Sequence, residues 1–244
     1  MNFSEFKPHN QLASLIDAYW DVTCKEGGNS IDKVLPDGCV DIVINLGDEY
    51  HIESENTILK SETAYLGGAI THYMEAKTLP ETHLVGVRFK PSAFSYFYSF
   101  SSLHEVTNNF VELPKEFTPK INCLSNDLSI AFNSFFYNKL IQPKHLLLPV
   151  IETIKNHHGD ITVNKLAGIH YTTIRSLERD FKYHIGLSPK EFINIIRYKF
   201  AQHLILTSPP QRTLYDIAFE CGYYDQAHLS NEIKKYTGVI PTNL

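Results

Sequence analysis

The chain has 244 residues, a length typical of one large domain or two modest ones. Hydrophobic residues make up 43% and charged residues 20% of it, which is ordinary globular usage and excludes disordered and fibrous proteins. The formal net charge is −5, but residues 1–146 hold 11 Lys and Arg against 18 Asp and Glu, whereas residues 147–244 hold 11 against 9. The second part is therefore better suited than the first to a polyanionic partner.

No apolar run approaches the ~18 residues that a membrane-spanning helix needs, so no membrane partner is expected. Residues 1–10 include Glu5, Lys7 and His9 and lack the apolar segment of a secretory signal, which predicts a cytoplasmic protein. No C-x-x-C spacing connects the four cysteines, and we expect reduced thiols in place of a zinc site, a redox motif or a disulfide framework. These cysteines are Cys24, Cys39, Cys123 and Cys221.

The first part of the chain predicts short strands separated by turns. Residues Val40–Leu46 are mostly β-branched and end at the turn pair Gly47-Asp48. Further expected strands are Trp20–Thr23, Tyr65–Leu66, His72–Ala76 and Leu84–Phe89. Several short strands punctuated by Gly, Pro and Asn favour a small antiparallel barrel or sandwich.

Helical patterns begin after Pro91. Residues Ser92–Tyr98 predict a short aromatic helix with Pro91 in its first turn, and Leu124–Leu140 predict a longer helix. Gln142-Pro143 then interrupts the chain, so we place a domain boundary near Lys144, which gives an α+β arrangement of domains 1–143 and 144–244.

The second part predicts helices throughout. One begins at Val150 and ends at Gly159, and Thr162 and Thr173 are expected to cap the next two. Ser188-Pro189 opens a long helix that ends before Pro209-Pro210. A second short-long pair follows, Leu214–Cys221 and Gln226–Tyr236, with Gly222 in its turn and Gly238 at its end.

The same pattern, a short helix, a turn and a longer helix, occurs twice in this second part. Leu166-Ala167, a turn and the helix Thr173–His184 form one copy, and Ile217-Ala218, Gly222 and the helix Gln226–Tyr236 form the other. A small alanine lets two helices cross closely, which is typical of the helix-turn-helix motif, whose second helix enters the DNA major groove. Residues Pro189 to Leu206 predict a connecting helix of ~27 Å, enough with its flanking turns to set two recognition helices about one DNA turn apart.

The motifs of this region resemble those of the AraC/XylS family of bacterial transcription regulators. The stretch Gly222–Lys235, with Gly238 and Pro241, is similar to the family's second-motif pattern. The residues that resemble the first motif and the linker helix are Phe181-Lys182, Gly186, Ser188-Pro189, Phe192, Arg197 and Ala201. Residues Val34–Cys39 and Gly86–Pro91 resemble an uncharacterised amino-terminal domain found on some members, which brings no known ligand with it.

The resemblance implies DNA contacts from the first recognition helix. Arg175 is suited to a bidentate contact with guanine, Glu178 to accept from cytosine, and Arg179 to a base or a phosphate. The full candidate set in this motif is Thr173, Arg175, Ser176, Glu178 and Arg179. The alternative is that these side chains form only the solvated face of an amphipathic helix.

The second recognition helix departs from the family pattern. Asn231 stands where the family commonly has arginine; it can pair with adenine but lacks the charge that holds phosphate. Ile233 replaces a phenylalanine and is expected to fill the same core volume. Gln226, Ala227 and His228 lie at the entering end of this helix, and His228 either contacts a base or only packs.

The first part is expected to sense a signal, to mediate dimerisation, or both. An effector pocket inside the small sheet would draw on Trp20, Tyr65, Tyr73 and Arg88, with Tyr19 and Phe89 nearby, although aromatic residues at such positions also serve as plain core. The helix Leu124–Leu140 either mediates a homodimer or packs within its own chain.

An enzymatic first part is disfavoured. His51, His72 and His83 are scattered and lack the H-x-H spacing of a metal-dependent enzyme, so no metal, cofactor or catalytic residue is expected. Asp37 and Asp41 would raise the pKa of Cys39, which we expect to be a buried structural thiol.

The sequence thus predicts a transcription regulator that binds double-stranded DNA through residues 144–244 and answers to a small-molecule effector or another unidentified signal through residues 1–143. RNA polymerase is a further expected partner. Two alternatives remain at this point. One is a ligand-binding or enzymatic protein whose helical part no longer binds DNA strongly. The other is an interaction protein whose helical part recruits RNA polymerase or another regulator without sequence readout.

Overall fold

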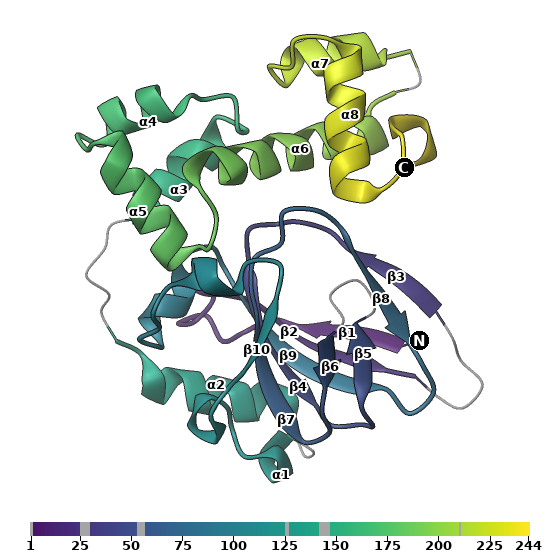
Figure 1. Cartoon of the computed structure of the whole chain (residues 1–244), viewed down its shortest axis with the longest axis vertical. Coiled ribbons are helices and arrows are strands. Elements are labelled where there is room, and N and C mark those ends of the chain that lie inside the picture. The colour runs from purple at the N-terminus through teal and green to yellow at the C-terminus, as the bar shows by residue number, and fades with distance from the viewer. Residues whose placement is uncertain (1, 25–29, 53–56, 125–126, 142–146, 210) are drawn as a thin grey trace.

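A computed structural model of the chain describes residues 2–24, 30–52, 57–124, 127–141, 147–209 and 211–244. A sheet with helices on one face forms the first part of the molecule, and six helices form the second part, which lies along one end of the sheet (Figure 1). The expected boundary near Lys144, like Gln142-Pro143 and Pro210, lies outside the described residues. Within the described ranges no helix is both long and apolar enough to cross a membrane.

The first part is built on a six-stranded antiparallel sheet of order β1-β2-β9-β4-β7-β10. Its strands are β1 (Asn2–Phe6), β2 (Ile16–Thr23), β4 (Val40–Asn45), β7 (Thr63–Gly67), β9 (His83–Phe89) and β10 (Phe110–Glu112). Two ribbons complete it, β3 (Ser30–Val34) paired with β8 (Met74–Thr78), and β5 (Tyr50–Ile52) paired with β6 (Thr57–Leu59). The antiparallel sheet predicted from the sequence is therefore confirmed.

The central strands are the ones that the sequence identifies. In β4 and β9, alternate residues point to opposite faces of the sheet, and both faces are covered. Ile42, Val87 and Phe89 pack into the larger core, whereas Val43 and Leu84 belong to a smaller cluster on the other face. Strands with two buried faces form continuous apolar runs, which explains why these two were predicted closely.

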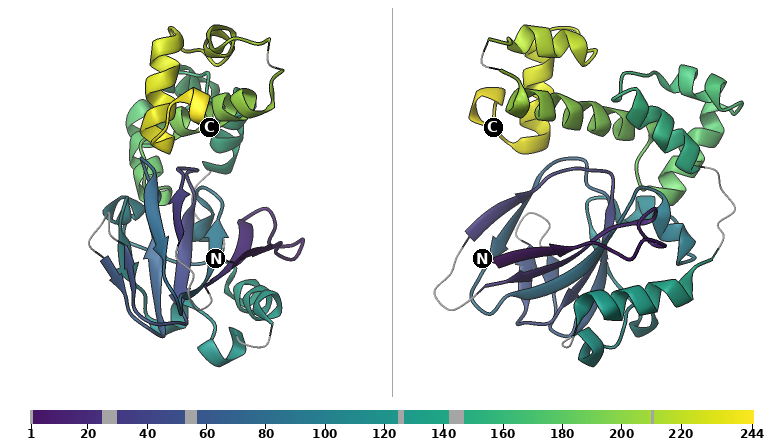
Figure 2. Two further views of the ribbon diagram at one scale, coloured as in Figure 1. Left: turned by 90° about the vertical axis from the view of Figure 1, so that its right-hand side faces the viewer. Right: turned by 180° about the vertical axis from the view of Figure 1, so that it is seen from behind.

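The helices of the first part cover the larger core. Phe132 and Phe136 of α2 (Leu128–Lys139) are fully buried and contact Tyr19 and Phe89 of the sheet. Figure 2 shows this helix lying across the sheet. The single helix expected over Leu124–Leu140 is wrong: α1 (Ile121–Leu124) ends there, and α2 begins after Asp127, whose carboxylate accepts the Ile130 amide.

The described residues of the first part also form the short 3-10 helices η2 (Ala93–Tyr96), η3 (Leu103–Val106) and η4 (Lys115–Phe117). The helix expected over Ser92–Tyr98 is shorter than predicted, because Ser92 adopts a left-handed conformation with φ of 66° and only the residues after it are helical.

The six helices of the second part are α3 (Leu147–Asn156), α4 (Val163–Ile169), α5 (Ile174–His184), α6 (Pro189–Thr207), α7 (Leu214–Glu220) and α8 (Gln226–Thr237); η5 (Pro241–Asn243) follows them. The predicted caps are confirmed. Thr162 accepts the Lys165 amide, Thr173 accepts the Ser176 amide, and Ser188 forms a capping box with Glu191. Gly238 ends α8 with φ of 75°, as expected for a left-handed cap.

The two parts share one continuous core. Leu103 and Phe97 of the first part belong to the same buried cluster as Phe181 and Phe192 of the second. Gly38, which precedes β4, packs so closely on Phe192 that a Cβ atom on it would lie 2.5 Å from Cε2 of that ring. The helical part is therefore seated directly on the sheet domain.

Candidate nucleic-acid interface and amino-terminal cavity

Each half of the helical part is a helix-turn-helix unit. In α4–α5 and in α7–α8, a buried alanine of the first helix, Ala167 or Ala218, accepts at its carbonyl the amide of a turn residue, Thr172 or Tyr223. The turns differ: Gly222 supplies the left-handed residue of the second turn with φ of 71°, whereas Tyr171 takes this conformation in the first, with φ of 48°. Both units predicted from the sequence are present.

Helix α6 holds the two units together through one arginine. The Arg197 guanidinium donates two hydrogen bonds to the Gly159 carbonyl, at 3.0 Å from Nε and 2.8 Å from the terminal nitrogen, and lies 5.7 Å from the Tyr223 ring centre. Gly159 precedes α4, and Tyr223 precedes α8. The units also touch directly, because a Cβ atom on Gly222 would lie 2.5 Å from the Asp160 carboxylate. Arg197 therefore connects both units to α6.

The two second helices point away from the sheet domain in the same sense. At the carboxyl end of α5, the Gly186 carbonyl accepts from the Thr107 hydroxyl at 2.6 Å. At the carboxyl end of α8, the Thr237 carbonyl accepts from the Lys33 ammonium at 3.0 Å. Because both carboxyl ends rest on the first part, the amino ends of α5 and α8 lie on the far side, at opposite ends of the 19-residue helix α6 (Figure 1).

The candidate residues of α5 share its outer surface. Arg175 and Arg179 are exposed, and Glu178 is half-buried. The Arg179 guanidinium pairs with the Asp180 carboxylate at 2.8 Å and also donates to the Ser176 hydroxyl at 3.2 Å. Thr173 is occupied as the helix cap. Of these two arginines, Arg175 is thus the more accessible to a new partner, because Arg179 must first give up its ion pair with Asp180.

The candidate residues of α8 are also exposed at its outer side: Gln226, Ala227, His228 and Asn231. The His228 ring packs edge-on against Tyr223 with ring centres 5.2 Å apart, so it has a structural role besides its exposure. Asp225, not His228, caps the helix by accepting the His228 amide at 2.7 Å. Ile233 is fully buried, which confirms that it fills core volume.

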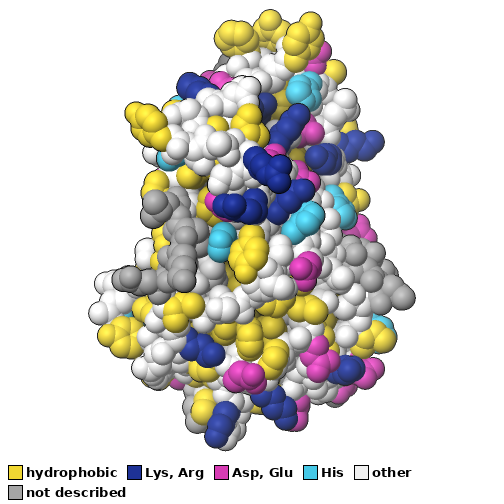
Figure 3. Space-filling view, turned by 60° about the vertical axis from the view of Figure 1, so that its left-hand side comes forward, with side chains coloured by type: hydrophobic (Ala, Val, Ile, Leu, Met, Phe, Trp, Pro, Cys, Tyr) yellow, Lys and Arg dark blue, Asp and Glu magenta, His cyan; other side chains and the backbone are white. Residues whose placement is uncertain are grey.

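Two residues at the entering ends of these helices were not predicted. Tyr171 is 99% exposed in the first turn and Tyr224 is 93% exposed in the second. Tyrosine hydroxyls are common phosphate ligands in DNA complexes. Lys and Arg side chains also gather over the helical part on the face that Figure 3 presents. Their position in the two turns could have identified them from the sequence. Hydrophobic periodicity alone, however, does not distinguish an aromatic residue of a turn from one of the core.

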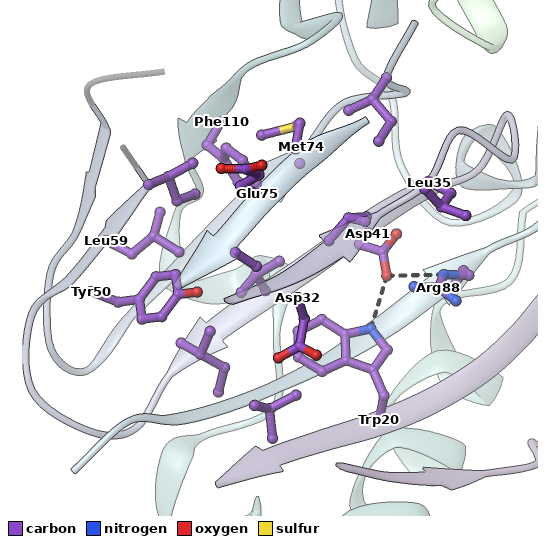
Figure 4. Close-up of a pocket in the computed structure, with 18 of the residues that line it drawn as sticks. Trp20, Asp32, Leu35, Asp41, Tyr50, Leu59, Met74, Glu75, Arg88 and Phe110 are labelled. Carbon is purple, nitrogen blue, oxygen red and sulfur yellow. Dashed lines mark hydrogen bonds and ion pairs between the residues drawn. The ribbon is translucent and has the colours of Figure 1, made fainter. Parts of the chain in front are cut away.

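The first part contains a cavity of about 270 Å³ between the sheet and the two ribbons (Figure 4). Most of its wall is apolar and includes Trp20, Leu59, Met74 and Phe110. Its charged lining residues are Asp32, Asp37, Asp41, Glu75 and Arg88. Concave, mostly apolar sites with a few polar groups are typical of small-molecule binding.

Only half of the predicted effector residues line this cavity. Trp20 and Arg88 do, but Tyr65 packs beside it with its hydroxyl accepting the Lys60 amide. Tyr73 instead lies against Gly238 of the helical part. Tyr19 and Phe89 are also misplaced by the prediction, because they point to the opposite face of the sheet, into the larger core. The sequence alone did not indicate which residues of each strand face the cavity. Because successive side chains point to opposite faces of a sheet, a shift of one residue moves a side chain to the other face.

An ion-pair network occupies one end of the cavity (Figure 4). The Asp41 carboxylate accepts the Trp20 indole N–H at 2.8 Å and lies 3.4 Å from Arg88 Nε, which is 3.7 Å from Asp37. Burial raises the pKa of Asp41 to about 6, against the lowering effect of Arg88. Burial, with Asp37 and Asp41, raises the pKa of the Cys39 thiol well above its usual range. Cys39 is half-buried and lines the cavity, so this thiol is less buried than expected, and its acidic neighbours raise its pKa as predicted.

Two family models match the chain. A domain of unknown function, DUF6597, matches residues 4–112, and a helix-turn-helix domain matches residues 166–244. Among curated relatives, an uncharacterized HTH-type transcriptional regulator of Haemophilus influenzae is 29% identical over 102 residues, covering 42% of this chain and 34% of that protein. The HTH-type transcriptional activator RhaS of Escherichia fergusonii is 29% identical over 96 residues, covering 39% and 34%. The chain thus spans about a third of the length of these relatives.

Among solved structures, ToxT from Vibrio cholerae matches over the whole chain. Its TM-score is 0.50 at 12% identity, with 100% of this chain and 97% of ToxT covered. A second ToxT structure, bound to (E)-4-(8-methylnaphthalen-1-yl)but-3-enoic acid, also has a TM-score of 0.50, at 14% identity, and covers 100% and 98%. The two-part fold is therefore shared with ToxT. The chain thus consists of a DUF6597 domain followed by a helix-turn-helix domain of the AraC type.

Proposed function

We propose that this protein is a transcription regulator that binds specific double-stranded DNA through α5 and α8. The observation that carries the proposal is the placement of the two helices at opposite ends of α6, with both amino ends directed away from the sheet domain. At 1.5 Å per residue, α6 is about 28 Å long, close to the ~34 Å that separates major-groove segments one turn apart. One chain is thereby suited to two successive segments of one DNA face.

The relatives support this function. Both are HTH-type transcription regulators by name, and the helix-turn-helix family model matches residues 166–244, the range that holds the candidate residues. This supports a regulator over a ligand-binding protein whose helical part no longer binds DNA. No catalytic step is proposed.

Helices α5 and α8 are proposed to contribute unequally to the affinity for DNA. On α5, Arg175 and Arg179 supply positive charge for phosphate and guanine. On α8 the first candidates are the neutral Gln226 and Asn231, and its lysines, Lys234 and Lys235, lie in the last turn. We therefore expect α5 to provide most of the affinity, and α8 mainly the register on the duplex.

The DUF6597 part, within the proposed domain 1–143, is proposed to control DNA binding through a small-molecule effector in the cavity. ToxT, which shares the fold, has a solved structure with a small organic acid bound, and this supports an effector as a class. Segments that line the cavity also contact the helical part: Gly38, between two lining residues, packs on Phe192, and the β3 residue Lys33, also between two lining residues, bonds to Thr237. A ligand that moves these segments would thus act on α6 and α8.

RNA polymerase and a second copy of the chain are the remaining proposed partners, in a cytoplasmic location. The buried side of α2 packs within its own chain, but Ile130 and Tyr137 on its outer side are 67% and 54% exposed. If this side is a dimer contact, Ile130→Asp will lower the dimer fraction measured by analytical ultracentrifugation, and Lys115→Asp, at an exposed site elsewhere, will not.

The first test is selection of bound duplexes from a random DNA pool at ~150 mM salt, where non-specific binding is weak. We expect a site with two elements about one turn apart. On that site, the double variant Arg175→Ala, Arg179→Ala is expected to bind at least about 30-fold more weakly, from ~1–3 kcal/mol for each base-contacting arginine.

A matched control separates lost contacts from lost charge. Lys115→Ala with Lys120→Ala removes two exposed cations from the first part and should change affinity less than about threefold. Failure to select any duplex, or equal affinity of the α5 double variant and the wild type, would contradict the proposed interface.

A further inference from the structure

The end of the cavity that contains Arg88 holds more carboxylates than cations. Arg88 is engaged by two aspartates, with Nε 3.4 Å from Asp41 and 3.7 Å from Asp37. Asp32 lines the same cavity from β3 (Figure 4), and its charge adds to the effect of burial, which is the main cause of the raised pKa of the Tyr50 hydroxyl. A ligand that enters this space therefore meets a net negative charge, which attracts a cation and repels an anion.

The remainder of the cavity is suited to an apolar body. Leu59 and Met74 from the ribbons face the Trp20 side of the sheet, and Phe110 closes one side. The Trp20 indole is fixed by its hydrogen bond to Asp41. The indole ring therefore adds apolar surface for the body of a ligand whose polar end lies beside Asp41. At about 270 Å³, the space admits a molecule of roughly a dozen non-hydrogen atoms.

We infer that the ligand of this cavity is a small amphiphilic cation, an apolar or aromatic body that carries one amine, with the ammonium group beside Asp41 and Asp37. The ligand class follows from the cavity itself, and only the regulatory consequence of binding rests on the proposed function.

Three probes of one skeleton test the charge preference: 4-phenylbutylamine, 4-phenylbutanol and 4-phenylbutanoate. They are titrated by calorimetry into the full-length protein without DNA at pH 7.5. We expect the amine to bind at least about tenfold more tightly than the alcohol, since a charge-assisted hydrogen bond is replaced by a neutral one, and the acid to bind most weakly. Equal or tighter binding of the acid, or no binding of the amine at millimolar concentration, would overturn the inference.

The isosteric variant Asp41→Asn locates the cation. Its amide oxygen can still accept from Trp20, and we expect the amine to lose about tenfold in affinity while the alcohol is unchanged. Asp48→Asn, which removes one exposed carboxylate outside the cavity, is the matched control and should bind all three probes as the wild type does. A second variant, Ala76→Trp, fills the cavity from β8 and should abolish binding of every probe. Undiminished amine binding in Asp41→Asn and Ala76→Trp would place the ligand elsewhere.

The pH dependence gives an independent readout. The groups that face Asp41 are Arg88 from β9, Asp37 and Cys39 from the preceding loop, and Trp20 from β2. Because the pKa of Asp41 is about 6 and a cation favours the ionised form, amine affinity should fall as the pH drops from 7.5 to 5. This fall should be smaller in Asp41→Asn, and an amine affinity that rises toward pH 5 would contradict the inference.

The DNA experiment is read separately. If the amine binds as expected but leaves affinity for the selected duplex unchanged, the ligand class stands and control by this cavity fails. If no duplex is selected, the proposed function fails, and the calorimetric comparison still decides the ligand class.

Discussion

Replacing Phe192 with alanine is expected to destabilise both parts of the molecule together, by about 3–5 kcal/mol. The ring is fully buried, lies edge-on to Phe181 of α5 with ring centres 5.9 Å apart, and packs on Gly38 of the sheet domain. Its removal leaves a cavity at the point where α5, α6 and the segment before β4 meet. The loss should therefore extend beyond the helical part.

Two optical signals test this expectation in one urea titration. Trp20 is the single tryptophan and lies in the sheet domain, so its fluorescence follows that part, whereas far-ultraviolet circular dichroism follows mainly the helices. In Phe192→Ala both midpoints should shift to lower urea by similar amounts. A shift of the circular dichroism midpoint alone would mean that the two parts unfold independently despite their continuous core.

Two controls accompany this variant. Phe192→Leu keeps most of the apolar volume and should cost less than ~1.5 kcal/mol. Phe219→Ala removes a phenylalanine that is 80% exposed and should stay within about 0.5 kcal/mol of the wild type.

The helical part could be predicted closely because its signals are local. Thr162, Thr173 and Ser188 cap helices where the sequence predicts, and a cap depends only on the few amides that follow it. The exposure of the α5 and α8 candidates likewise follows from helical period. What the local pattern does not contain is the pairing of Arg179 with Asp180, since a side chain that points outward can still be engaged by its neighbour.

The cavity was predicted less well because its wall is assembled over long distances. Asp37 and Asp41 meet Arg88 only because β4 pairs with β9, and Asp32 joins them through the ribbon of β3 and β8. Pairing partners of this kind are not encoded in any short segment. The β3 and β1 strands were missed for a related reason: they are largely exposed at Ile31, Val34 and Phe3 and so lack the apolar run of a core strand.

The spacing of the two helix-turn-helix units depends on Arg197, because it is the side chain that bonds to the segment before α4 and also lies over Tyr223 before α8. The backbone of Gly159 is pressed onto α6 so closely that a Cβ atom there would lie 2.5 Å from the Arg197 amide nitrogen. The Arg197 side chain thus adds hydrogen bonds to a close backbone contact between Gly159 and α6. Its two hydrogen bonds fix the angle of the first unit, while its ring contact restrains the turn of the second.

We therefore expect Arg197→Met to weaken binding to the selected two-element site by at least about tenfold, while affinity for either element alone changes little. The variant should also lose discrimination against a site in which the two elements are moved apart by about five base pairs, half a helical turn, because its units are no longer held at one spacing. Fluorescence anisotropy with the two duplexes measures both effects.

The control is Lys199→Met, which removes an exposed cation two residues further along α6 and should keep the discrimination between the two sites. If Arg197→Met and Lys199→Met lose affinity equally and both keep the spacing preference, then Arg197 contributes only charge, and the preference must come from the packing of Gly159 and Gly222 alone.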